Sequence, residues 1–255
     1  MEYINNPSEL TYQHNVPFVV WCYWEGAPMN ANRLLSYEYL QKNIQVPICL
    51  ITKENLAAFI KPEHPLHEAF PYLSVVHRSD YIRAYLMHFY GGAWHDIKAT
   101  EVSFKNCWYE FENPDIYLIG RPENQKGAAR VYDEHNRYMP DYWKELVAVP
   151  AWIAKGNTPM TAEIYTAFLS LLDTNMESLK KHPAKHPREK FIQPKNIFHA
   201  VIIRLKQLYS GRNPYYPLPW TVFGNIFHPI VYKYRKHISK NLPVNKIKNA
   251  GIYHR

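Results

Sequence analysis

The start of the chain alternates between strand, helix and strand patterns, and this alternation constrains the fold more than any other feature. Residues 16–24, VPFVVWCYW, are a near-continuous run of β-branched and aromatic residues, typical of a strand that is covered on both faces. Residues 30–43 repeat leucine and tyrosine at roughly helical spacing, and residues 46–52 form a second apolar run. We therefore expect an α/β protein with a mostly parallel sheet flanked by helices.

Residues 79–92, SDYIRAYLMHFYGG, predict a helix that a double glycine ends, because glycine adopts a left-handed conformation at no steric cost. Ser79 is the expected N-cap. Four apolar side chains at i, i+3, i+4 and i+7 form one face, and Asp80 and Arg83 lie nearly opposite, so they are expected to point away from the apolar core. Taken alone, this pair is expected to be a solvated ion pair.

Residues 93–98, AWHDIK, predict a short strand. Asp96 and Lys98 are two residues apart, so they project to the same side of that strand, and taken alone they indicate a salt bridge at the surface or strand end. Further strands are expected over residues 115–120 and 146–155, and a helix over residues 159–172, where a proline suits the first turn.

Charge divides the chain into two parts. Residues 181–255 hold 15 Lys and Arg against Glu189 alone, a net charge of +14, whereas residues 1–180 hold 15 against 21 acids, a net charge of −6. We expect an α/β domain over residues 1–180, completed by a basic C-terminal segment, residues 181–255, with a helix over residues 196–209. The positive charge indicates a polyanionic partner: nucleic acid, anionic lipid headgroups or an acidic polymer.

The three cysteines, Cys22, Cys49 and Cys107, have neither metal nor redox spacing, which favours a reducing compartment. The N-terminal sequence MEYINNPSEL lacks the basic and apolar regions of a signal peptide. No window approaches the roughly eighteen apolar residues of a membrane span. We expect a soluble cytoplasmic protein that can lie peripherally on the inner membrane face through its basic end.

Residues 77–98, HRSDYIRAYLMHFYGGAWHDIK, resemble the core motif of small GT-A-type glycosyltransferases of the capsular polysaccharide synthesis group and the related glycosyltransferase family 32. That motif reads Ser-Asp-x-x-Arg, a helix, Tyr-Gly-Gly, then an apolar strand ending in Asp-x-Asp. Lys98 departs from it, and the matching residues are Ser79, Asp80, Arg83, Tyr90, Gly91, Gly92 and Asp96. Residues 19–26 and 151–165 resemble other family segments, and residues 224–234 resemble the C-terminal block of a capsular subgroup with Asp-Ile-Lys.

The resemblance implies a GT-A-like, Rossmann-like fold and an enzyme that transfers a sugar from a nucleotide-diphosphate-sugar donor to a surface glycan of the capsule or lipopolysaccharide type. It implies that residues 1–180 bind the nucleotide sugar. A UDP-sugar is the favoured donor, a hexose the expected sugar, and retention of configuration the expected outcome. The expected acceptor is a glycan or a lipid-linked glycan, and the basic segment is assigned to the donor diphosphate, an anionic acceptor or an anionic membrane surface.

In the resembled family the Asp-x-Asp carboxylates hold Mn²⁺ or Mg²⁺ against the donor phosphates, whose charge grows as the glycosidic bond breaks. Asp96 is therefore the implied metal or sugar ligand and, with Lys98, a catalytic candidate. Two alternatives stay open. Lys98 itself supplies part of the neutralising charge, or a metal is held by Asp96 and a C-terminal group such as His228, which otherwise is a partly buried ring before Pro229.

The resemblance also assigns Trp24, Asp80 and Arg83 to nucleotide-sugar binding. Trp24 would stack on the base, and its other interpretation is a core aromatic at a strand end. Asp80 would contact the ribose or base, and Arg83 the sugar or phosphate. These side chains would line the cleft beyond the carboxyl ends of the strands, where open α/β sheets bind ligands.

Two other functions compete with this one. The basic segment interleaves Tyr215, Tyr216, Trp220 and Tyr232 with lysine and arginine, a combination that offers phosphate contacts and stacking surfaces to nucleic acid. No recognisable nucleic-acid-binding motif orders these residues, so nucleic acid is the less favoured partner. The substitution of an acid by Lys98 leaves a third hypothesis, a non-catalytic relative that binds a glycan or nucleotide without turnover.

Overall fold

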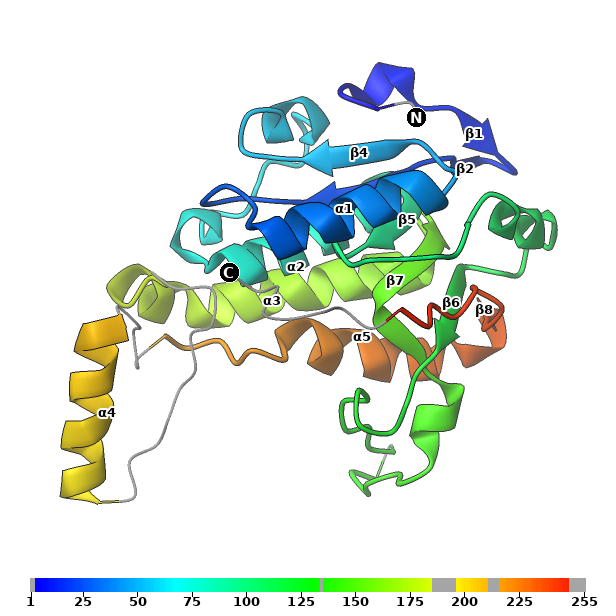
Figure 1. Ribbon diagram of the computed structural model, residues 1–255. Helices are drawn as coiled ribbons and strands as arrows, with labels where there is room; N and C mark the ends of the chain where they lie inside the picture. The colour runs from blue at the N-terminus through cyan, green and yellow to red at the C-terminus, as the bar shows by residue number, and fades with distance from the viewer. Residues whose placement is uncertain (1–2, 134, 185–195, 211–215, 248–255) are drawn as a thin grey trace.

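The computed structural model describes residues 3–133, 135–184, 196–210 and 216–247, and its centre is a six-stranded sheet in the order β4-β3-β5-β7-β6-β8 (Figure 1). Five strands run in one direction, and β7 runs antiparallel to both neighbours. The α/β class with a mostly parallel sheet is therefore confirmed. The strands are β3 (Val20–Tyr23), β4 (Ile48–Ile51), β5 (Gly91–His95), β6 (Leu118–Pro122), β7 (Val147–Lys155) and β8 (Ile238–Ser239).

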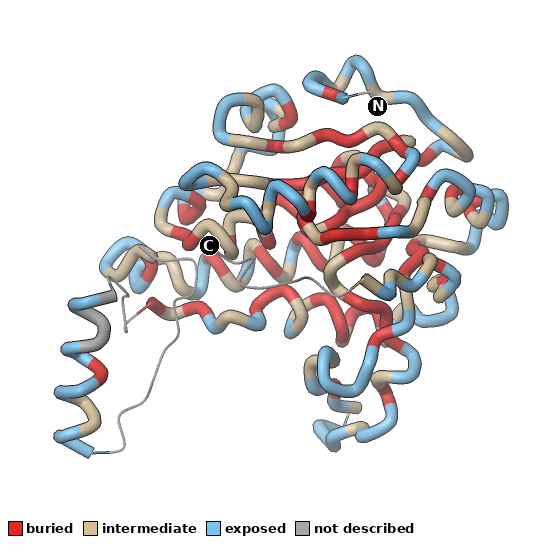
Figure 2. The backbone as a smooth tube through the Cα atoms, in the orientation of Figure 1, coloured by how far each residue is buried: buried red, intermediate tan, exposed pale blue. Residues whose placement is uncertain are grey.

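Helices cover both faces of this sheet, and each face has its own group of buried side chains. α1 (Ala31–Asn43) lies on one face with the loop that carries Phe104. α2 (Val75–Phe89), α3 (Pro159–Lys181) and α5 (Val222–Lys233) lie on the other, and α3 packs against both α2 and α5. Figure 2 shows buried backbone concentrated between these layers, whereas α4 (Ile197–Ser210) stands at one end of the molecule.

The strand expected over residues 16–24 divides in two. Val16–Pro17 forms β2, which pairs with β1 (Tyr12–Gln13) in a small antiparallel sheet, and the central sheet receives only β3. Pro17 has no N–H to donate to a ladder, which is why an extended run is interrupted there. All residues of β3 are buried between β4 and β5, as the apolar run predicts.

The helix expected from Ser79 begins five residues earlier. The N-cap is Ser74, whose side chain accepts a hydrogen bond from the backbone N–H of His77 at 3.3 Å, so Ser79 lies inside α2 and the expected cap is wrong. Val75 and Val76 open the helix, because β-branched residues disfavour helices only weakly and packing overrides that preference.

The expected strand over residues 93–98 begins and ends earlier, because β5 covers Gly91–His95. Gly91 and Gly92 both have positive φ, at 81° and 93°, and a Cβ on Gly91 would lie 2.5 Å from the backbone N of Gly156. The double glycine thus allows a close backbone approach at the helix-to-strand junction. Asp96 and Lys98 follow the strand instead of lying on it.

Later elements agree with the sequence in kind and differ in length. The strand expected over residues 146–155 is β7, and the helix opened by Pro159 is α3, capped by Thr158 and continuing to Lys181. The strand expected over residues 115–120 is shifted to Leu118–Pro122. The helices expected near residues 30–43 and 196–209 are α1 and α4.

Residues beyond 180 contribute to the same sheet and core. β8 pairs in parallel with β6, with Leu118 opposite Ile238, and α5 packs against α3 and β7. The proposed division of function between residues 1–180 and 181–255 stays a prediction. Within the described residues, no helix has the length and apolar character needed to cross a bilayer.

Candidate functional site

Two predicted site residues lie at one edge of the sheet. Because β3 and β5 run in the same direction, the residues that follow them, Trp24 and Asp96, lie at the same edge. β6 runs in that direction too, so Arg121 and Glu123 reach this edge as well. In α/β sheets with parallel strands, ligands bind outside the carboxyl ends of the strands. This edge is the candidate site.

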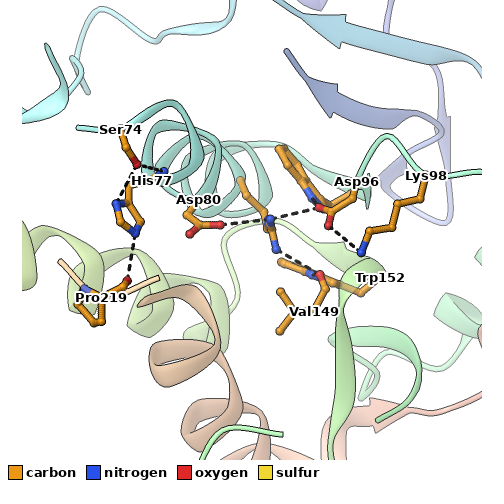
Figure 3. Close-up of polar contacts among 10 residues, drawn as sticks. Ser74, His77, Asp80, Asp96, Lys98, Val149, Trp152 and Pro219 are labelled. Carbon is orange, nitrogen blue, oxygen red and sulfur yellow. Dashed lines mark hydrogen bonds and ion pairs between the residues drawn. The ribbon is translucent and has the colours of Figure 1, made fainter. Parts of the chain in front are cut away.

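Asp96 is surrounded by donors and cations (Figure 3). Its Oδ1 accepts hydrogen bonds from Nε1 of Trp94 at 3.1 Å and from Nη2 of Arg83 at 3.3 Å, and its Oδ2 lies 3.5 Å from Nζ of Lys98. Burial acts to raise the pKa of Asp96, but Arg83 and Lys98 outweigh it and hold the pKa below its usual range. The side chain is 28% exposed, so this ionised carboxylate is accessible to a ligand.

Arg83 joins α2 to three other parts of the molecule. The nitrogen that contacts Asp96 also lies 3.2 Å from Oδ1 of Asp80, and Nη1 donates to the carbonyl of Val149 at 3.2 Å. The guanidinium lies between the rings of Trp94 and Phe223, 4.8 and 4.3 Å from their centroids. Arg83 therefore links the middle of α2 to the end of β5 and to the starts of β7 and α5.

The expectation that Asp80 and Arg83 form a solvated pair is wrong. Asp80 is 6% and Arg83 is 4% exposed. Their helix face does point away from the apolar side of α2, but α5 and the start of β7 cover it, a tertiary contact that a helix wheel does not reveal. Burial, reinforced by Asp96 and opposed by Arg83, raises the pKa of Asp80 to about 7.

Trp24 lies immediately after β3, partly exposed at the same edge. Its Nε1 donates to the carbonyl of Ala27 at 3.0 Å, and the guanidinium of Arg33 lies 5.3 Å from its ring centroid. Arg33 also donates to the carbonyl of Ile97 at 2.6 Å, so α1 is tied to the segment between Asp96 and Lys98. Stacking of a base on Trp24 stays a prediction.

His228 is fully buried on α5, where the expectation was partial burial. Its Nδ1 accepts a hydrogen bond from the backbone N–H of Ala129 at 2.9 Å, and its Nε2 lies 3.5 Å from Oε2 of Glu123. One nitrogen is thus occupied and the other faces a buried carboxylate at the end of β6. Among the described residues, no three or more His, Cys, Asp or Glu form a group suited to a metal ion. Ligation by His228 stays a prediction.

His77 joins the start of α2 to the segment before α5 (Figure 3). Its Nε2 lies 3.1 Å from the carbonyl of Pro219, so Nε2 carries the proton, and Nδ1 accepts from the Tyr216 hydroxyl at 2.7 Å. Burial lowers the pKa of His77 to about 4, so the ring is neutral at pH 7. These bonds hold the chain that leads into α5 against the helix that carries Asp80 and Arg83.

Sequence reasoning missed Arg121 and His95. Arg121 is on β6 and half-buried, and within the described part of the chain its Nε and Nη2 are buried without a hydrogen-bond partner. His95 is the last residue of β5, with its Nδ1 directed at the backbone carbonyl of Asp96. A usable signal was present: Arg121 follows the apolar run YLIG as directly as Asp96 follows AWH.

The sheet and the charged cluster at its carboxyl edge define an α/β protein with a candidate site for an anionic ligand. The chain belongs to the capsular polysaccharide synthesis protein family, whose sequence pattern matches residues 2–142. That region includes Trp24, Asp80, Arg83, Asp96 and Lys98, and it ends before β7 and α5.

Comparison with other proteins adds little to this assignment. A solved structure described as PaToxG Glycosyltransferase is 14% identical, with 86% of each chain covered and a TM-score of 0.30. A similarity this low supports no statement about fold or function. No curated protein matches the chain.

Proposed function

We propose that this chain is a glycosyltransferase that moves a sugar from a nucleoside diphosphate donor to a surface glycan of the capsule or lipopolysaccharide type. The observation that carries the proposal is the network of Asp80, Arg83, Asp96 and Lys98 at the carboxyl edge of the sheet, within the residues that match the family. Family membership supports a role in polysaccharide synthesis, and the network supplies charges of both signs for a sugar and its diphosphate.

In the proposed reaction, the bond between the anomeric carbon and the β-phosphate oxygen breaks, and its electron pair leaves with the nucleoside diphosphate. An acceptor hydroxyl forms the new bond to the anomeric carbon and releases its proton. Cations near the departing phosphate lower the barrier because they stabilise the charge that develops there. Lys98 lies at the accessible end of the network and takes this role, and Asp96 orients it and binds sugar hydroxyls.

The other assignments extend this proposal. Trp24 stacks on the base, Asp80 contacts the ribose or base, and Arg83 holds both carboxylates in place while its own burial limits it to indirect contact with the donor. On the family resemblance, we take the donor to be a UDP-sugar, the sugar a hexose and the configuration to be retained. The location is the cytoplasmic side of the membrane, next to a lipid-linked acceptor.

The residues present do not fit a divalent cation at Asp96. Both carboxylate oxygens already face positive or donor groups, Arg83 and Trp94 at Oδ1 and Lys98 at Oδ2. A divalent ion bound to Asp96 would be repelled by both cations, and Lys98 occupies the place of the second acidic ligand. A Mn²⁺ or Mg²⁺ ion held by Asp96 and His228 stays a prediction that these contacts disfavour.

The nucleic-acid alternative loses part of its basis. Tyr216, one of the expected stacking residues, is buried with its hydroxyl against His77, and Tyr232 and Trp220 are half-buried. Tyr215 lies outside the described residues. Aromatic residues in these positions do not form an exposed stacking surface within the described part of the chain.

The test is donor turnover. UDP- and GDP-sugars are incubated with the full chain, with Mn²⁺ and with EDTA, and hydrolysis or transfer is followed by mass spectrometry. We expect turnover of at least one donor and its loss in Asp96→Asn, with little change in Asp173→Asn, a surface control on α3. Absence of binding and turnover for every nucleotide sugar, or unchanged turnover in Asp96→Asn, contradicts the proposal.

A further inference from the structure

At the carboxyl edge of the sheet, Lys98 is only loosely paired with an acid. Arg83 is committed to Asp80 and Asp96, but the ion pair of Lys98 with Asp96 is long, 3.5 Å, where a strong charged hydrogen bond measures about 2.7–2.9 Å. The Lys98 side chain is partly exposed, so its ammonium group is free to turn toward a ligand. This cation lies where the resembled motif places a second metal-binding acid.

Arg121 brings a second cation to the same edge. In the sheet, β7 separates β5 from β6, and the register pairs His95 with Ala151 and Gly120 with Trp152, so Arg121 lies at nearly the same level as His95. Strand alternation puts both side chains on the face that α1 covers, since Ala93 and Ile119 belong to that core. The charge of Asp96 acts on Arg121 across this short span.

The Nε and Nη2 atoms of Arg121 are buried and, among the described residues, have no hydrogen-bond acceptor. Leaving charged donors unpaired in the interior is costly, and native proteins retain such groups where a ligand completes them. Nearby, burial together with Arg121 and Lys98 lowers the pKa of His95 to about 4, so a neutral ring lies beside the two cations. The buried donors of Arg121, together with Lys98, are therefore suited to bind an anion.

We propose that Lys98 and Arg121 bind the diphosphate of the donor directly and take the place of a divalent cation. The proposal rests on the proposed function, because it assigns the leaving group of that reaction to these two side chains. Two fixed cations match the charge of about −2 on a nucleoside diphosphate bridge, and Arg presents a planar fork suited to phosphate oxygens. The catalytic cycle then requires no metal ion.

The test uses inorganic pyrophosphate and UDP as probes in isothermal titration calorimetry, with the full chain in EDTA and in Mn²⁺. We expect the wild type to bind both probes in EDTA, with little change on adding Mn²⁺. Arg121→Gln is expected to weaken binding by about tenfold or more. Lys98→Asp is expected to lose binding in EDTA and recover it in Mn²⁺, because the change restores an acidic pair. Lys105→Asp, an exposed charge reversal near the C-terminal end of α1, is the matched control.

Each outcome decides between the two proposals. Binding of pyrophosphate by the wild type only with Mn²⁺, or in neither condition, overturns the cation site. Donor turnover that EDTA abolishes also overturns it, while leaving the glycosyltransferase proposal intact. Metal-free pyrophosphate binding that Arg121→Gln removes, without turnover of any nucleotide sugar, supports the anion site and contradicts the transferase proposal. Thermal melts of every variant confirm that binding changes arise in folded protein.

A separate observation concerns α4. Its apolar side chains at i, i+3, i+4, i+7 and i+11 form one stripe, and every one is exposed, from 49% to 97%. These residues are Phe198, Val201, Ile202, Leu205 and Tyr209. Large apolar stripes on a soluble surface mark an interaction site, since exposing them to water is unfavourable. By contrast, Ile203, on the opposite side, is buried.

Length and charge identify the partner. α4 has 14 residues, too few to cross the apolar layer of a bilayer but enough to lie along its surface. α4 itself carries Arg204 and Lys206 and no acid, and it belongs to residues 181–255, which hold 15 Lys and Arg and one acid, so the helix is complementary to an anionic surface. Figure 1 places α4 at one end of the molecule, and the exposed fractions of its apolar stripe show that these side chains are accessible to a partner.

We infer that α4 lies in the interface of an anionic bilayer with this stripe buried among the lipids. The test is co-sedimentation of the full chain with vesicles of phosphatidylcholine alone or with about one third phosphatidylglycerol. We expect binding to anionic vesicles that falls by about tenfold or more in the double variant Phe198→Ser and Leu205→Ser. The double variant Leu34→Ser and Leu35→Ser, which removes two half-exposed leucines from α1, is the control.

Equal binding by both double variants and the wild type overturns the inference, as does the absence of vesicle binding. Light scattering after size exclusion tests the competing occupant, a second copy of this chain. A dimer that the α4 variant converts to a monomer, without lipid binding, assigns the stripe to self-association and overturns the inference.

Discussion

Asp80 and Asp96 share one partner atom: Nη2 of Arg83 lies 3.2 Å from the first carboxylate and 3.3 Å from the second. The two acids differ in environment, because Asp80 is almost fully buried and Asp96 also contacts Lys98. Their pKa values therefore move apart, with that of Asp80 raised to about 7 and that of Asp96 held low. A pair of acids separated in this way is suited to hold one negative charge and to share one proton near neutral pH.

The raised pKa of Asp80 predicts how stability depends on pH. The folded state binds the proton more tightly than the unfolded state, so Asp80 destabilises the fold progressively as pH rises from about 4 to about 7. The free energy of unfolding of the wild type minus that of Asp80→Asn should decrease over this window by on the order of 2–4 kcal/mol. Urea unfolding at several pH values measures the difference, and a constant difference contradicts the prediction.

Arg83→Met is expected to destabilise the protein by about 3–5 kcal/mol, because it leaves two carboxylates without their shared cation in a buried site. Arg137→Met is the matched control. Arg137 pairs with Asp133 at 2.8 Å, but its side chain is 74% exposed, so its loss should cost under about 1 kcal/mol. The change in the free energy of unfolding of each variant is measured from its urea midpoint, with the slope of the transition unchanged. Equal changes in the two variants would contradict the assigned role of Arg83.

Two serines distinguish the observed start of α2 from the expected one. Ser74→Ala removes a buried N-cap and should cost about 1–2 kcal/mol. Ser79→Ala lies within the helix, where alanine is the better helix former, and should change stability by less than about 0.5 kcal/mol. Thermal melts of the two variants compare these losses. A larger loss of stability in Ser79→Ala than in Ser74→Ala would indicate that Ser79 is the N-cap.

Gly91→Ala tests the close approach at the start of β5. The new Cβ would lie 2.5 Å from the N of Gly156 and 2.7 Å from the O of Ala154, both backbone atoms that cannot yield cheaply. Gly26→Ala also places alanine at positive φ but meets no atom within 4 Å, so it isolates the conformational cost of about 1–2 kcal/mol. In urea unfolding, Gly91→Ala should lose clearly more stability than Gly26→Ala. Equal losses would show that the backbone approach at Gly91 is not tight.

Trp24→Ala is expected to weaken nucleotide binding by about 1–3 kcal/mol if the base stacks on this ring. The loss should appear in the dissociation constant for UDP and leave pyrophosphate binding unchanged, because pyrophosphate has no base. Calorimetry with both probes separates a stacking role from a structural one. Equal weakening of both probes would assign Trp24 to the support of the nearby loop.

Local patterns determined much of the fold in advance. The strands of the first half and the helices begun by Asn30 and Pro159 depend on apolar periodicity and capping, which act within a few residues. The β-α-β alternation thereby indicated the class of sheet. The antiparallel insertion of β7 and the contribution of β8 depend on contacts between distant residues, and no local pattern specifies them.

In the candidate site, too, features set by neighbouring residues were predicted and features set by distant contacts were not. Asp96 and Lys98 were predicted to interact from their spacing, and an ion pair links them, although on a loop instead of a strand. Arg121 was missed because its importance arises only when β6 is placed two strands from β5. The burial of Asp80 and Arg83 was misjudged because α5, more than a hundred residues away in sequence, covers their face of the helix.

The position of β7 determines when this protein can fold during synthesis. Among the described residues, β6 pairs with β7 and β8 and with no other strand, and both follow residue 142, where the family match ends. A nascent chain that stops there has β5 with one unpaired edge and β6 with no neighbour in the central sheet. Long-range pairing of this kind slows folding and leaves strand edges open to aggregation. The carboxyl edge of the sheet therefore assembles only after β7, residues 147–155, has left the ribosome.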